Sequence, residues 1–319
     1  MYQLANSRLW QGRIDSKTDF DSFRFHQVVE FKNTEELADR KQAFTIVGFE
    51  CDEGVRRNEG RLGAKHAPDE LRKALAALPY HFEKYQKLID TGNIICEDGR
   101  LESAQRELGN HIENLLKRST TPIILGGGHE TLYGHYLGAR QFIGADKKLG
   151  LINIDAHFDM READAPSSGT MFRQILETDI NAGYLVLGIQ SFGNTKALFN
   201  KADKLGCQYI LAENLSTECA TKLAIDDFCH NHDYVLLTLC TDSIAASAAP
   251  GVSAPAPFGL DPLVVRGLIS YITRKENTRS FDISEVNPLL DENGKTVKLA
   301  AYLIAEAMDG FADKVIEKE

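Results

Sequence analysis

The chain has 319 residues, of which 43% are hydrophobic and 26% are charged, a composition typical of globular proteins. Its formal net charge of −10 argues against a nucleic-acid partner, which requires clustered lysine and arginine. The polar, mixed sequence of residues 1–14 predicts no secretory signal, and no apolar run approaches the roughly 20 residues of a membrane span.

The cysteines are scattered along the chain and form no C-x-x-C pair. They are Cys51, Cys96, Cys207, Cys219, Cys229 and Cys240. Without a secretory signal, we expect free thiols in a reducing compartment, and therefore a cytoplasmic protein.

Residues 1–42 predict a mixed, partly helical lead-in segment. The β-branched and aromatic run that follows predicts a strand over 43–49, then a glycine-spaced loop over 52–63. Pro68 and Asp69 open a predicted helix over 67–77. Further apolar runs predict strands over 84–91, 121–125, 149–159, 184–189, 209–211, 233–242 and 278–283. Helices are predicted over 100–117, from 131, and over 169–177, 194–205, 216–230, 262–273 and 298–318.

The predicted strands alternate with helices, and several of them are apolar on both faces. This pattern favours a mainly parallel central sheet covered by helices on each side, a three-layer α/β sandwich. The sequence shows no fixed-period repeat, no low-complexity tract and no linker. A single domain over residues 1–319 is therefore the simpler interpretation, with 1–42 as its lead-in.

The predicted strand over 149–159 ends in residue types that bind metals. Asp155, His157 and Asp159 stand at i, i+2 and i+4, so in a strand all three side chains would point the same way. Two carboxylates and an imidazole suit a divalent cation, which would also relieve the repulsion between the acids. The alternative is a solvated strand end whose acids are incidental.

Polar groups also follow three other predicted strands. His129 comes after Gly-Gly-Gly, Cys240 and Asp242 end a second apolar run, and Glu285 follows a third. In open α/β sheets, ligands bind beyond the carboxyl ends of the strands, so we expect these groups to share one edge. The candidate ligands are then His129, Asp155, His157, Asp159, Cys240 and Asp242. Six ligands suit two ions about 3.5 Å apart, and such a pair can lower the pKa of a bound water.

These motifs together resemble the ureohydrolase family, which contains arginases, agmatinases and formimidoylglutamases. The Gly-Gly-x-His element of the family resembles residues 126–129, and its Asp-Ala-His-x-Asp element matches 155–159. Its Asp-x-Asp strand with a Pro/Gly-rich loop resembles 240–251, and its Glu-Val-Asn-Pro element matches 285–288. The resemblance spans roughly residues 45–310 and implies an arginase-like fold.

Two departures point to the formimidoylglutamase branch. Cys240 replaces the first Asp of the third element, and Phe172 stands where arginases carry a proton-shuttle histidine. A stretch over 58–64 is also similar to that branch. The resemblance implies two manganese ions per subunit and hydrolysis of N-formimidoyl-L-glutamate to formamide and L-glutamate, in histidine breakdown.

The resemblance also implies roles for individual residues. A hydroxide that bridges the metals attacks the formimidoyl carbon, and Asp159 moves the proton to the departing amine. Glu285 holds the amidinium-like end of the substrate by a charge-assisted hydrogen bond. Ser168 and Thr170 are expected to contact the substrate. Arg173 is the candidate for a substrate carboxylate, because a guanidinium matches that shape; a surface arginine is the alternative.

Three alternatives stay open. The thiolate of Cys240 is softer than a carboxylate and would favour zinc, iron or cobalt, or Cys240 is a buried thiol that leaves one ion weakly held. The enzyme could act on another amidine or guanidine, as agmatinases and arginases do. The chain could also be a metal-binding homologue without turnover. A small-molecule substrate is the expected partner, and a homo-oligomer is left open.

Overall fold

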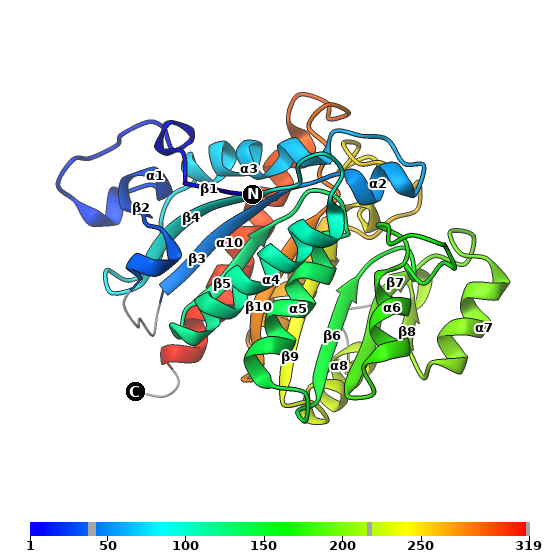
Figure 1. Ribbon diagram of the computed structural model, residues 1–319. Helices are drawn as coiled ribbons and strands as arrows, with labels where there is room; N and C mark the ends of the chain where they lie inside the picture. Colours follow the sequence, from blue (N-terminus) through cyan, green and yellow to red (C-terminus); the bar gives the residue numbers. More distant parts are fainter. Residues whose placement is uncertain (38–42, 216–218, 317–319) are drawn as a thin grey trace.

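The computed structural model describes residues 1–37, 43–215 and 219–316, and within them a sheet of ten strands lies between two layers of helices (Figure 1). The strands are β1 Tyr2–Gln3, β2 Glu30–Phe31, β3 Ala43–Glu50, β4 Lys87–Ile95, β5 Thr121–Leu125, β6 Leu149–Ile154, β7 Ala182–Ile189, β8 Gln208–Leu211, β9 Tyr234–Cys240 and β10 Thr278–Ser284. The helices are α1 Phe25–Val28, α2 Glu53–Arg57, α3 Ala67–Ala76, α4 Leu101–Lys117, α5 Thr131–Ile143, α6 Met171–Thr178, α7 Lys196–Lys204, α8 Cys219–His230, α9 Pro262–Thr273 and α10 Lys295–Ile316.

The strand order is β1-β4-β3-β5-β10-β9-β6-β7-β8, and β2 also pairs with β4. Every described pair is parallel except β1 with β4. The prediction of a mainly parallel sheet is confirmed. Parallel pairing gathers the carboxyl ends of the strands at one edge, where loops from distant parts of the chain meet.

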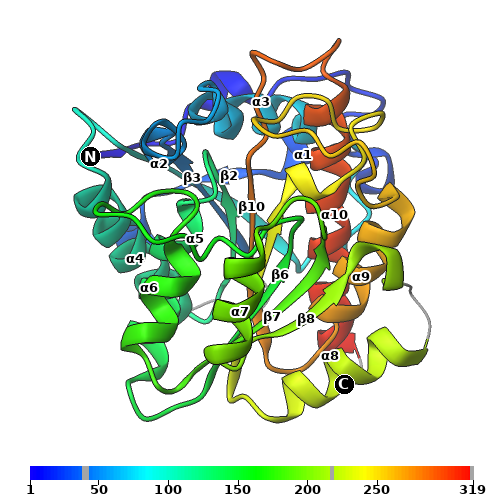
Figure 2. The same cartoon turned by 90° about the vertical axis from the view of Figure 1, so that its right-hand side faces the viewer.

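Two apolar cores fill the space between the sheet and its helices. Figure 2 shows α4, α5 and α6 on one side of the sheet and α9 and α10 on the other. Side chains from α4, α5 and α6 contribute to the core on one face, and those from α3, α9 and α10 contribute to the core on the other. The residues of β6 and β9 are buried along their whole length, as expected for strands covered on both faces. The predicted three-layer arrangement is therefore confirmed.

Several element boundaries differ from the predictions. The predicted loop over 52–63 contains the short helix α2, and the lead-in segment contributes β1 and β2 to the sheet edge. The last helix begins at Lys295 because Asp291 accepts hydrogen bonds from the backbone N–H groups of Thr296 and Val297. Residues 216–218 and 317–318, which belong to two predicted helices, lie outside the described residues.

The prediction that Asp155, His157 and Asp159 alternate along a strand is wrong. Strand β6 ends at Ile154, and the backbone then turns because the Asp155 carboxylate accepts the N–H of His157 at 2.9 Å. Asp159 adopts a positive φ of 49°. These side chains therefore converge through the shape of a turn rather than through strand periodicity.

The same correction applies after β9. This strand ends at Cys240, and Asp242 lies in a 3-10 turn over Thr241–Ser243, so the two do not alternate on one strand face.

None of the helices within the described part of the chain is both long and apolar enough to cross a bilayer.

Candidate active site

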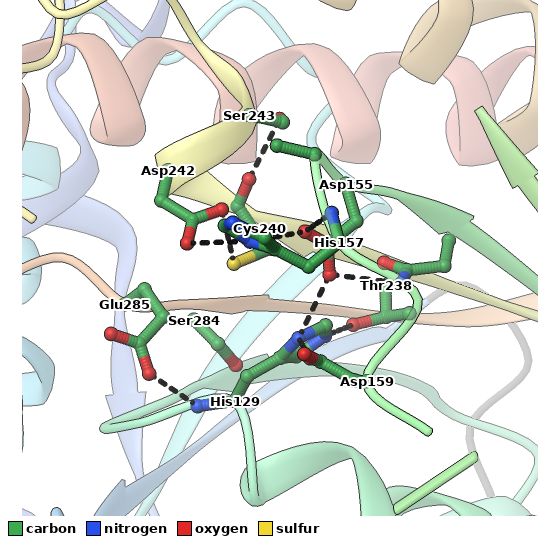
Figure 3. Close-up of polar contacts among 12 residues, drawn as sticks. His129, Asp155, His157, Asp159, Thr238, Cys240, Asp242, Ser243, Ser284 and Glu285 are labelled. Atoms are coloured by element: carbon green, nitrogen blue, oxygen red, sulfur yellow. Dashed lines mark hydrogen bonds and ion pairs between the residues drawn. The ribbon is translucent and has the colours of Figure 1, made fainter. Parts of the chain in front are cut away.

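Four neighbouring strands at the centre of the sheet, β5, β10, β9 and β6, end at or shortly before a polar group of the candidate site. The register aligns their ends: Ile283 pairs with Leu125, Ser284 with Cys240, and Ile154 with Leu239. The adjacency of these strands brings together residues far apart in the sequence, as Figure 3 shows. The six predicted metal ligands lie in this one cluster.

The ligand atoms form two overlapping groups. His129, Asp155 and Cys240 make one group, and Asp155, His157 and Asp242 make the other, with all ligand atoms of a group within 4.8 Å of one another. Asp155 belongs to both groups, so its two oxygens face two different sets of partners. Its Oδ2 lies 3.1 Å from His129 Nδ1, and its Oδ1 lies 3.6 Å from His157 Nδ1.

The remaining ligands close the cluster. Asp159 Oδ2 lies 2.9 Å from His129 Nδ1. Asp242 lies 3.3 Å from His157 Nδ1 through one oxygen and accepts the thiol of Cys240 at 2.9 Å through the other. The cluster therefore holds three carboxylates, two imidazoles and a thiol in contact with one another.

Burial and mutual repulsion shift the acids of the site. Burial, followed by the charge of Asp155, raises the pKa of Asp159. Burial, together with the charges of Glu130 and Asp242, raises the pKa of Glu285 to about 8. The charged forms of these carboxyl groups are therefore destabilised, because the groups are buried and lie close to other acids.

The negative charges of the site also raise the pKa values of the Cys240 thiol and the His157 imidazole. Burial and then the charges of Asp155 and Asp242 raise the pKa of Cys240 well above its usual value. Burial opposes protonation of His157, but the carboxylates of Asp242 and Asp155 raise its pKa to about 12. The excess negative charge is thus balanced by protons, and a divalent cation could replace them. The donor set, with nitrogen, oxygen and sulfur atoms directed at two shared spaces, fits such cations.

Groups beneath the cluster orient His129. Its Nε2 lies 3.1 Å from the Thr238 hydroxyl, which donates to Asp282 Oδ1 at 2.7 Å. The other oxygen of Asp282 lies 2.7 Å from His135 Nδ1. All four side chains are fully buried or nearly so, and fixing the ring in this way directs Nδ1 toward the cluster.

Two backbone features place Glu285 next to the cluster. A Cβ at Gly127 would lie 1.8 Å from the carbonyl oxygen of Cys51, so only glycine fits there. The carbonyl oxygen of Gly127 accepts the N–H of Glu285 at 2.8 Å. Glu285 has a positive φ of 67°, and its carboxylate accepts the N–H of His129 at 2.9 Å. Strained φ values at Asp159 and Glu285 are typical of functional positions.

A cavity of about 90 Å³ opens onto the cluster and onto Glu285. Arg161 is the one arginine or lysine among the described residues that line the cavity. The lining residues outside the ligand set are Val55, Asn58, Gly60, Arg161, Ser168, Ser253, Ala254 and Glu285. The predicted contact residue Ser168 thus faces the cavity.

Two of the residues predicted to contact substrate lie elsewhere. The Thr170 hydroxyl accepts the N–H of Ser167 at 2.9 Å, so it shapes the turn that carries Ser168. Arg173 donates to the carbonyl of Ala163 at 3.4 Å and pairs with Glu177. Neither side chain is among the described residues that line the cavity.

Sequence reasoning missed Arg161, Asn58 and Thr238. Thr238 could have been found, because it precedes Cys240 by two residues on the same strand and so shares its face. Arg161 follows Asp159 by two residues, but its place in an irregular loop gave no periodic signal. Phe172, in contrast, is a buried ring stacked on Tyr184, with a centroid distance of 3.9 Å, and provides no proton carrier.

Comparisons by sequence and by structure both find proteins named formimidoylglutamase or formiminoglutamase. The model of the arginase family matches residues 42–310. Curated formimidoylglutamases from Geobacillus sp. (strain WCH70) and Lysinibacillus sphaericus are 54% and 53% identical, and each alignment covers 98% of this chain and at least 97% of the relative. A solved formiminoglutamase of Trypanosoma cruzi with Mn²⁺ superposes with a TM-score of 0.79 at 26% identity, covering 91% of this chain and 98% of the other.

Proposed function

The chain belongs to the arginase family, and on this premise we propose that it hydrolyses N-formimidoyl-L-glutamate to formamide and L-glutamate. The observation that carries the proposal is the shared position of Asp155 between two groups of ligand atoms beside a cavity that also holds Glu285. The identity to formimidoylglutamases over nearly the whole chain supports this substrate over arginine or agmatine.

Two Mn²⁺ ions are the proposed cofactor. His129, Asp155, Asp159 and Cys240 would hold one ion, and Asp155, His157 and Asp242 the other. When bound, such cations supply Lewis-acid activation of water near neutral pH. The Trypanosoma cruzi relative solved with Mn²⁺ supports manganese, whereas the Cys240 thiol would also accept a softer metal.

Asp159 is the proposed proton carrier. Its carboxylate belongs to the ligand cluster and also lines the cavity, so it can pass a proton from water at the ions to a substrate in the cavity. In hydrolysis, one water proton passes to Asp159 and then to the amino nitrogen of the glutamate part as its bond to the formimidoyl carbon breaks. The phenyl ring of Phe172, which stacks on Tyr184, cannot transfer a proton, so we assign the proton transfer to Asp159.

Glu285 is the proposed partner of the amidinium end. Its backbone is fixed to Gly127, and one of its oxygens is fixed to the N–H of His129, so the carboxylate has a defined direction at the wall of the cavity. A cationic formimidoyl group would stabilise the charged form of Glu285 against the repulsion from Glu130 and Asp242.

Arg161 is the proposed partner of a substrate carboxylate. Its guanidinium lines the cavity and makes one long hydrogen bond, at 3.4 Å, to the side-chain oxygen of Asn58. A contact of this length is weak and can be exchanged for a bidentate pair with a carboxylate. The position of Arg161 thus suits an anionic substrate better than the position of Arg173 does.

We expect Arg161→Ala to raise the KM for N-formimidoyl-L-glutamate by about 10- to 100-fold, because a charged hydrogen bond contributes about 1.5 to 3 kcal/mol. Steady-state kinetics of Arg161→Ala, Arg161→Lys and Arg173→Ala measured side by side provide the check. The lysine variant should recover part of the loss, since it keeps the charge but not the fork. A large KM effect in Arg173→Ala, with none in Arg161→Ala, would return the assignment to Arg173.

A substrate panel tests the proposed reaction itself. Protein loaded with Mn²⁺ is incubated separately with N-formimidoyl-L-glutamate, arginine and agmatine, and formamide and urea are assayed. Formamide release from the first substrate, without urea from the other two, is the expected result. Urea release would assign the chain to another branch of the family, and a metal-loaded protein inactive on all three would indicate a non-catalytic homologue.

A further inference from the structure

We propose that Arg57 is a positioning residue that holds the substrate-binding rim of the cavity in place. The inference rests on the proposed function, because it concerns how the carboxylate side of that substrate is received. The rim is the loop over residues 161–169, here called the rim loop, which carries Arg161 at its start and Ser168 near its end, both lining the cavity.

The rim loop has little support of its own. Its residues 161–165 are exposed, and it contains no helix or strand. The N–H of Arg161 donates to the carbonyl of Gly169 at 2.8 Å, which closes the loop on itself but does not attach it to the sheet. Attachments to the rest of the protein therefore decide where Arg161 and Ser168 lie.

Arg57 provides the attachment next to Ser168. Its Nη1 donates to the carbonyl of Pro166 at 3.1 Å and to Glu102 at 2.6 Å. Its Nη2 donates to the carbonyl of Gly99 at 3.1 Å, and its Nε donates to Glu53 at 2.9 Å. One planar guanidinium thus joins α2, the start of α4 and the rim loop, which a lysine could not do with the same geometry.

The residue after α2 provides a further contact with the rim loop, in addition to the contacts of Arg173 with Ala163 and of Lys201 with Glu162. Asn58, which follows α2, lines the cavity and accepts a hydrogen bond from Arg161. A Cβ at Gly169 would lie 2.9 Å from the end of the Asn58 side chain, so a larger residue here would displace Asn58 from its place beside the loop. If Arg57 is lost, the rim loop and the start of α4 lose this attachment to α2, while the ligand cluster keeps all of its own contacts.

The neighbouring Arg56 is a matched control. Among the described residues it hydrogen-bonds to Glu53 and not to the rim loop, and its side chain is 60% exposed compared with 19% for Arg57. Both residues are arginines on the same helix, so a difference between them reports on the attachment rather than on the charge.

The test is steady-state kinetics of the Mn²⁺-loaded full chain, with L-glutamate as the competing product. We expect Arg57→Ala to raise both the KM for N-formimidoyl-L-glutamate and the Ki of L-glutamate about tenfold, because a disordered rim must be ordered at each binding event. We expect kcat to stay within about twofold, because Asp159 and Glu285 are untouched, and Arg56→Ala to behave as wild type.

Several results would overturn the inference. An unchanged KM in Arg57→Ala, or a fall in kcat without a change in KM, would mean that Arg57 serves folding alone. If Arg57→Ala does not fold, Glu102→Gln weakens the same attachment from the other side and should raise KM about threefold. A wild-type chain inactive on this substrate would refute the proposed function instead, and would be seen before any variant is compared.

Discussion

Replacing Asp155 by Asn should abolish both turnover and metal retention. Asp155 is the one residue shared by the two groups of ligand atoms, so its loss removes a charged donor from both sites at once. Loss of a residue that only supports a metal ligand costs about 10- to 100-fold. We therefore expect the activity of Asp155→Asn to fall by more than about 1000-fold, with less than one ion per chain by elemental analysis.

Asp146→Asn is the matched control for this prediction. Asp146 is an exposed acid on the loop that leads into β6, at the opposite end of the strand from Asp155. The control should retain wild-type activity and metal content. A metal-loaded and fully active Asp155→Asn enzyme would refute the assignment of Asp155 as the bridging ligand.

Replacing Glu285 by Gln should separate substrate binding from metal binding. The amide keeps the size of the side chain but removes the charge that the amidinium end requires, and one lost electrostatic partner in such a site costs about 100- to 1000-fold. Glu285 belongs to neither group of ligand atoms, so the metal content should stay at the wild-type value.

The measurement is kcat/KM for N-formimidoyl-L-glutamate together with metal analysis of the same preparation. Glu285→Asp, which keeps the charge on a shorter side chain, should recover part of the activity. If Glu285→Gln loses its metal, Glu285 serves the metal centre; if it keeps full activity, the proposed contact with the amidinium end is absent.

The sequence predicted the layers of the fold because long, fully buried strands leave a clear apolar signal. Strands β6 and β9 are of this kind, and helix α4 leaves a similarly clear signal because its buried residues recur with the helical period. The two-residue strands β1 and β2 and the five-residue helix α2 carry no such signal, since contacts with the rest of the sheet decide their structure.

The positions of the site residues were predicted for a partly wrong reason. Placing polar groups at strand ends was enough to bring His129 and Asp155 together, because parallel pairing aligns those ends. Strand alternation was not involved, as the turn after β6 directs His157 and Asp159. Arg161 was missed because the geometry of an irregular loop depends on distant contacts, here with Asn58.

Diffraction measured on both sides of the manganese absorption edge tests the central claim most directly, that side chains from neighbouring strands hold paired ions. Crystals of the Mn²⁺-loaded protein should show two anomalous peaks, with Asp155 between them and Cys240 in contact with one. A single peak, no peak, or peaks away from these side chains would contradict it.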